Sequence, residues 1–130
     1  MKLSVTSSVM IDEGPALSLA SELDTESYVM ATVSLEQGAS RTVSLLPHDG
    51  APVLLAIRAT GASGKYVTVR IRANPSEPPA PEQAWIEVKG TLLISGADVL
   101  KGLGTPRSLG IENTGAEAAT VDVLSCIDLP

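Results

Sequence analysis

Hydrophobic and polar residues alternate along most of the chain. In the stretch 67–72, for example, two valines and an isoleucine alternate with a threonine and two arginines. A period of two residues gives one buried and one solvated face, which is typical of strands in antiparallel sheets. The alternating stretches are 3–11, 29–35, 43–45, 53–57, 67–71, 86–94, 109–111 and 121–127.

Turn residues separate these stretches, with Gly or Pro in nearly every gap. Strand signals spaced by roughly 8–12 residues are typical of all-β sandwiches. The pattern therefore predicts one all-β domain over residues 1–130, an antiparallel two-sheet sandwich of eight or nine strands that is jelly-roll-like. Hairpins are expected around Gln37-Gly38-Ala39 and around Asn113-Thr114-Gly115.

Two stretches fit other structures. Residues 16–25 could form a short helix, or a loop with one strand, and residues 97–103 could form a single helical turn. Neither stretch is long enough to change the predicted fold class.

A proline-rich segment interrupts the alternation at 74–82, where four of nine residues are prolines. Proline fixes φ and lacks a backbone donor, so no central strand can run there, and a stiff loop of polyproline II character is expected. The loop could cross between the sheets or project as a contact arm. Trp85 closes it and could be a core plug or an interface anchor.

Composition narrows the core and the ligands. Hydrophobic residues make up 44% of the chain, with no Phe, one Trp and two Tyr. The core must then consist of aliphatic side chains, and there are few aromatic rings on which sugars or bases could stack. The net charge of −6 argues against a general nucleic-acid binder.

The lone cysteine, Cys126, cannot form an intramolecular disulfide and is expected to be a small buried residue. Synthesis in a reducing compartment is favoured. The first residues alternate at once, without the apolar stretch of a signal peptide, and no apolar run approaches the roughly 18 residues of a membrane span. We therefore expect no membrane partner.

Candidate chemistry is scarce. The one histidine, His48, lies in a Pro-His-Asp-Gly turn sequence at 47–50 and is expected to be exposed. No acid–base pair or nucleophile–base arrangement is apparent, so we expect no catalytic residue and no enzyme. Histidines and cysteines are too few for zinc, and the acidic stretch 12–26 lacks the spacing of a calcium loop. We therefore expect no metal and no cofactor.

Charge is distributed unevenly. Arg58, Lys65, Arg70 and Arg72 are expected on two neighbouring strands, and the acidic stretch 12–26 lies apart from them. Such faces suit contact with a second copy or with an acidic protein surface, although ordinary solvated charges would give the same pattern. The candidate protein-contact residues are Trp85, Arg70, Arg72, Pro78, Pro79, Val5 and Val9.

Five stretches, at 28–45, 65–71, 88–96, 108–115 and 118–124, together resemble small β-sandwich virion structural proteins of tailed bacteriophages. The resemblance covers most of the chain after residue 26. It implies a non-enzymatic capsid decoration (cement) protein, made in the host cytoplasm and assembled on the virion. The implied partners are the major capsid protein or another virion protein, and further copies of the chain, with a trimer favoured. A neck, tail or fibre-base protein, or a carbohydrate-binding or adhesin module, are the alternatives.

Overall fold

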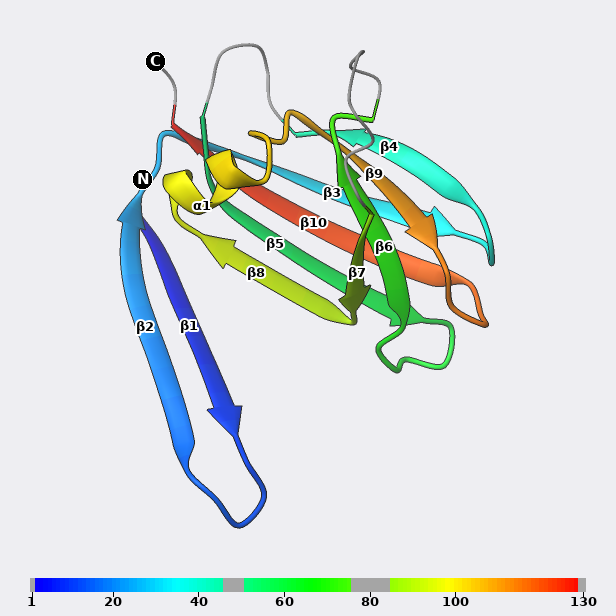
Figure 1. The fold of residues 1–130 in the computed structure, drawn as a ribbon, viewed down its shortest axis with the longest axis horizontal. Coiled ribbons are helices and arrows are strands. Elements are labelled where there is room, and N and C mark those ends of the chain that lie inside the picture. The colour runs from blue at the N-terminus through cyan, green and yellow to red at the C-terminus, as the bar shows by residue number, and fades with distance from the viewer. Residues whose placement is uncertain (1, 46–50, 76–84, 129–130) are drawn as a thin grey trace.

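The computed structural model describes residues 2–45, 51–75 and 85–128. These residues form ten strands and one short helix (Figure 1). The elements are β1 (Lys2–Met10), β2 (Ala16–Asp24), β3 (Ser27–Leu35), β4 (Ser40–Ser44), β5 (Ala51–Gly61), β6 (Thr68–Ala73), β7 (Ile86–Lys89), β8 (Thr91–Ser95), α1 (Ala97–Gly102), β9 (Ser108–Asn113) and β10 (Ala119–Asp128).

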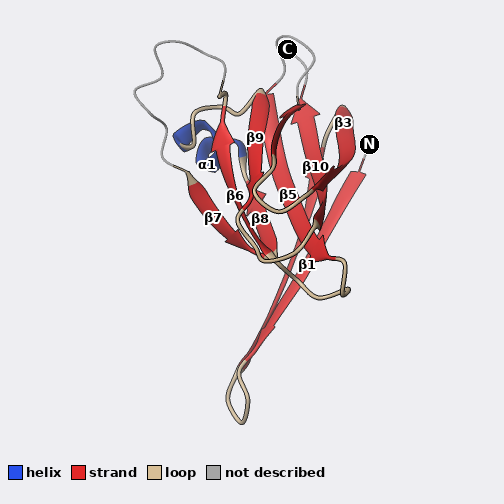
Figure 2. Cartoon of the chain, turned by 90° about the vertical axis from the view of Figure 1, so that its right-hand side faces the viewer, coloured by secondary structure: helices blue, strands red, loops and turns tan. Residues whose placement is uncertain are grey.

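Eight of the strands form two four-stranded sheets, in the orders β3-β10-β5-β8 and β4-β9-β6-β7. Every pairing within them is antiparallel. The two sheets lie face to face in a sandwich (Figure 2), and their strand orders are those of a jelly roll. The predicted antiparallel sandwich is confirmed, with ten strands in place of the expected eight or nine.

Two stretches account for the larger number of strands. Residues 16–24 form a full strand, β2. The single run expected at 86–94 is two strands in different sheets, because Gly90 has a φ of +85° and turns the chain between β7 and β8. The helical turn expected after β8 is present as α1, which buries Leu100. The described parts of the chain contain no helix long and apolar enough to cross a membrane.

The core lies between the two sheets and is aliphatic, as the composition predicts. Alternate residues of the paired strands point inward, so that period two places a buried residue at every second position. The strand residues buried there are Val33, Leu35, Val43, Leu55, Ile57, Ala59, Val69, Ile71, Val88, Leu109, Ile111, Ala119, Val121 and Val123.

The two expected hairpins are corners that cross between the sheets. β3 pairs with β10, and β4 pairs with β9, so neither β3–β4 nor β9–β10 is a hairpin. The corners lie side by side: the amide of Gly38 donates to the carbonyl of Asn113 at 3.0 Å, and the amide of Asn113 donates to the carbonyl of Ala39 at 2.9 Å. Each corner therefore supplies hydrogen bonds to the other.

β1 and β2 form a separate two-stranded sheet, registered from Lys2↔Asp24 to Met10↔Ala16. This ribbon, residues 2–24, projects away from the sandwich in both views (Figures 1 and 2). We call it the arm. The strand expected at 3–11 is thus one half of it.

Candidate protein-contact surfaces

The arm has one apolar and one polar face. The register places the pairs Leu3↔Leu23 and Val9↔Leu17 on the same face, with Val5↔Ser21 and Ser7↔Leu19 between them. The opposite face has mainly Ser, Thr and charged side chains, which alternate with the apolar ones along both strands. The arm is therefore an amphipathic β-ribbon.

The apolar face is covered only near the sandwich. Leu3, Val5 and Leu23 are partly buried, whereas Val9 and Leu17, near the tip, are 53% and 58% exposed. An isolated two-stranded ribbon is marginally stable in water at best, and exposed apolar surface on this scale is typical of a contact site. The distal half of the arm is thus an uncovered apolar surface.

A second apolar surface lies on the outer face of the β3-β10-β5-β8 sheet. The registers align Met30, Leu124, Ala56 and Leu93 in one row across the four strands. The adjacent row begins with Tyr28, next to Cys126. We define Tyr28, Met30, Leu93 and Leu124 as the apolar patch. Tyr28 is 57% exposed and Met30 is 64% exposed, so much of the patch is uncovered.

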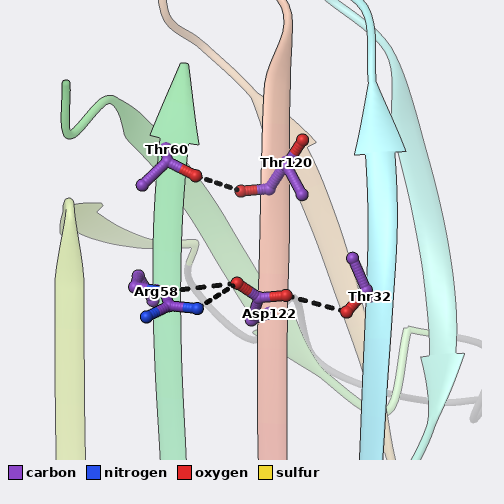
Figure 3. A network of polar contacts seen from close by, with 5 residues as sticks. All are labelled: Thr32, Arg58, Thr60, Thr120 and Asp122. Carbon is purple, nitrogen blue, oxygen red and sulfur yellow. Dashed lines mark hydrogen bonds and ion pairs between the residues drawn. The ribbon is translucent and has the colours of Figure 1, made fainter. Parts of the chain in front are cut away.

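The next row on the same face is polar and internally satisfied (Figure 3). The hydroxyl of Thr32 donates to Asp122 Oδ1 at 2.7 Å, and Arg58 donates to Asp122 Oδ2 at 3.2 Å from Nε and 2.9 Å from Nη2. The hydrogen bond from Thr32, followed by that from Arg58, lowers the pKa of Asp122. The bond to Asp122 raises the pKa of Arg58. The outer face therefore divides into an apolar half and a polar half.

The base of the arm meets the apolar patch and leaves hollows there. A hollow of about 410 Å³ has Val5 and Leu19 of the arm and Leu93 of β8 in its wall. A second, of about 220 Å³, lies between Leu3, Tyr28, Leu124 and Cys126, among others. The contact between these two apolar surfaces is thus incompletely filled.

Cys126 is 2% exposed, and burial raises the pKa of its thiol. A buried thiol with a raised pKa is a poor nucleophile. The prediction that Cys126 is a small buried residue is confirmed.

A third surface lies on the outer face of the other sheet, where Trp85 stacks with two arginines. The guanidinium carbons of Arg70 and Arg72 lie 4.4 and 4.6 Å from the centre of the Trp85 ring. Arg70 also forms an ion pair with Glu112 at 2.9 Å. The Nε atoms of both arginines are buried without a hydrogen-bond partner. Cation–π contacts of this kind fix the ring and both guanidiniums in place.

The sequence-predicted contact residues fall into separate groups. Trp85, Arg70 and Arg72 come together, and Trp85 is partly buried and lies outside the core cluster. Val5 and Val9 lie on the apolar face of the arm. Pro78 and Pro79 lie outside the described residues, as does His48.

The expected basic face is wrong. Arg58 lies on β5 and the two stacked arginines lie on β6, and these strands belong to different sheets. Because consecutive strands change sheets here, residues that are close in sequence point from opposite sides of the sandwich.

Most of the acidic stretch 12–26 is spread along the arm. Asp12 and Glu13 lie in the tip turn, and Glu22 and Asp24 lie near the base. In the described ranges, no three His, Cys, Asp or Glu side chains are grouped so that they could hold a metal ion.

The apolar patch was not predicted. Its signal in the sequence is the run 28–31, where Tyr, Val, Met and Ala follow one another without a polar residue. A strand with apolar residues on both faces has its second face covered, or available to be covered.

No protein-family model matches the chain, and no curated protein matches its sequence.

Proposed function

We propose that this chain is a non-enzymatic structural protein of a phage particle, a decoration (cement) protein that stabilises the capsid by protein–protein contacts. Its expected partners are the major capsid protein and further copies of itself, in a trimer. The proposal rests on the resemblance of the strand phrases after residue 26 and on the surfaces described above. The jelly-roll fold agrees with it without deciding it, since the fold serves viral capsid proteins and lectins alike.

The arm is the observation on which the proposal chiefly depends. A closed sandwich already buries its own core, so a projecting amphipathic ribbon adds nothing to that core. A shell protein must contact its neighbours over extended surfaces, and an apolar-faced ribbon provides such a surface. Repetition of the contact at every symmetry position gives tight attachment from modest individual affinities.

The Trp85 cluster suits attachment to the shell. Tryptophan and arginine are the residues most often found at the energetic centres of protein interfaces. Here the ring and both guanidiniums are held in place before binding, which lowers the entropy lost when a partner docks. The two arginines favour a partner surface with carboxylates.

Capsids assembled without this protein provide the test. Purified protein should bind to them and raise their melting temperature. Trp85→Ala should weaken binding at least tenfold. Tyr66→Ala truncates an aromatic residue that is 65% exposed and lies beside Gly90, at the opposite end of β7 from Trp85, and this variant should bind as the parent does. Circular dichroism would establish that both variants fold. A protein that neither binds capsids nor raises their melting temperature would contradict the proposal.

Labelling of intact particles separates the alternatives. Signal over the head supports decoration, and signal at the neck, tail or fibre base supports the second virion role. A carbohydrate-binding or adhesin module would bind members of a glycan panel, with or without calcium.

A further inference from the structure

The arm and the apolar patch are two uncovered surfaces of similar chemistry on one chain. Val9 and Leu17 are exposed on the arm, and Met30 and Tyr28 are exposed on the patch. Burial of apolar surface of this kind is the main favourable term in most protein association. Any partner that covers only one of the two surfaces leaves the other in water.

The fold itself brings the two surfaces face to face. At the base of the arm, Leu3 shares one hollow with Tyr28 and Leu124, and Val5 shares the other with Leu93. The distal half of the same arm extends past the sandwich, where the β3-β10-β5-β8 sheet of the same molecule does not cover it (Figure 2). The arm is therefore too long to bury its apolar face on its own body.

We propose that the distal arm of one copy lies with its apolar face on the apolar patch of a second copy. The partner is another molecule of this chain, because a second copy supplies both missing surfaces: its patch receives the arm, and its own arm covers a further patch. Contacts of this head-to-tail kind leave none unsatisfied when the rotation between neighbouring copies closes a ring.

Charge agrees with this partner. The rows that contain the patch have no charged residue, so an acidic arm meets no repulsion there. The next row adds Arg58, whose side chain is 60% exposed. The tip turn of the arm has Asp12 and Glu13, which are both exposed. Because Arg58 is paired with Asp122, this row has no net charge, and the acidic tip of the arm meets no net repulsion there.

The area of a single contact is small. The distal half of the arm is roughly 15 Å long and 10 Å wide, so its apolar face offers about 150 Å², and one contact buries about 300 Å² when the covered surface is included. Each copy both gives and receives an arm, so it makes two such contacts, and closure of the assembly adds to the affinity of each one.

Light scattering on the purified full-length protein, without capsids, tests the proposal. The parent protein should be oligomeric at micromolar concentration. Val9→Ser/Leu17→Ser replaces one cross-strand pair on the apolar face and should weaken association at least tenfold. The control, Met10→Ser/Ala16→Ser, replaces the adjacent pair on the opposite face and should leave association unchanged. A monomeric parent protein, or equal effects of both double variants, would overturn the proposal.

Disulfide trapping tests the geometry even if the serine variants fold poorly. One preparation contains Leu17→Cys and a second, of different mass, contains Met30→Cys; they are mixed under mild oxidation by copper phenanthroline. A mixed-mass disulfide between the two preparations should form readily. Met10→Cys mixed with Met30→Cys should form much less, because residue 10 lies on the other face of the arm. Equal yields in the two mixtures would contradict the arm-to-patch contact.

This inference extends the self-association part of the proposed function and not the virion role, so the two can fail separately. A monomer that binds and stabilises capsids would contradict the arm-to-patch contact and support the decoration role. An oligomer that depends on the arm but does not bind capsids would support the contact and contradict the decoration role.

Discussion

Asn113 is a polar residue with 1% exposure that joins the two corners of the sandwich. Its side-chain amide donates to the carbonyls of Leu35, at 3.1 Å, and Glu117, at 2.8 Å. Its side-chain oxygen accepts from the amide of Gly115 at 2.9 Å. All three polar groups therefore depend on one buried side chain.

Asn113→Ala should lower the free energy of unfolding by about 3 kcal/mol, because it leaves buried donors and acceptors without partners. Urea unfolding at neutral pH measures the loss. Thr114→Ala is the control: its exposed hydroxyl donates to the carbonyl of Thr68 at 3.3 Å, and its removal should cost below about 0.5 kcal/mol. Similar losses in the two variants would show that Asn113 is only a turn residue.

The carboxylate of Asp122 should make stability depend on pH. Its folded pKa is lowered, first by the hydrogen bond from Thr32 and then by that from Arg58. Its contribution is therefore fully present above the unfolded pKa of about 3.9 and is lost as the pH falls through the lower folded value.

Asp122→Asn should cost about 1 kcal/mol at pH 7 and progressively less as the pH falls from 7 toward 2, because the parent carboxyl becomes protonated as the pH passes through its lowered folded pKa. Urea unfolding of both proteins across this range gives the difference. In Thr32→Val, carboxyl chemical shifts should show the pKa of Asp122 moving back toward its ordinary value. A difference between parent and Asp122→Asn that does not change with pH would contradict this account.

At the scale of single residues, the sequence predicts burial better than it predicts partners. Alternation places Val69 and Ile71 inside, and both are buried. It identifies Asn113 as part of a turn but not as a buried amide, because Leu35 lies 78 positions away and only the fold brings it near. The stacking of Trp85 on Arg72 is likewise a contact between elements that no local pattern encodes.

At the scale of elements, two turns each have a glycine with positive φ, but they differ in the room available for a side chain. Gly38, in the β3–β4 corner, has a φ of +78° and open space where a Cβ would stand. Gly90, between β7 and β8, has a φ of +85°, and a Cβ there would lie 2.6 Å from Cβ of Tyr66. An alanine is strained at both positions but collides only at the second.

We expect Gly38→Ala to cost about 1 kcal/mol and Gly90→Ala about 3 kcal/mol, since the second adds overpacking to backbone strain. Thermal and urea unfolding of the pair measure the difference. Equal costs would show that Tyr66 yields to the added methyl group.

Element boundaries follow from the sequence wherever a pattern has a single explanation. The stretch at 121–127 lies wholly within β10. The run at 86–94 was predicted as one strand because its alternation continues through Gly90. The structure divides it into two strands, because the chain changes sheets at that residue. Residues 16–24 were ambiguous because three leucines and two alanines, spaced among serines, suit a helix or a strand until a partner strand is known.

At the scale of the whole molecule, pairing joins the two ends of the chain. β3 and β10 begin and end the sandwich and lie side by side over their length. The chain also changes sheets at every connection from β3 to β10 except β6–β7. A sequence pattern gives the number of faces to be buried but not this order, because strands of similar composition could pair in other ways.

The same topology predicts that the sandwich unfolds as one unit. Neither sheet contains a run of consecutive strands longer than two, so the strands of each sheet are joined through strands of the other. Unfolding followed by the fluorescence of Trp85, the sole tryptophan, and by far-UV circular dichroism should give the same midpoint. Folding should relax in milliseconds to seconds, as expected for long-range β pairing.

A chain beginning at Thr25 should also give the same unfolding midpoint by fluorescence and by circular dichroism, because the arm lies outside the core cluster. Separate midpoints in that truncated chain would mean that one sheet is stable alone, and that the crossings between the sheets do not couple them.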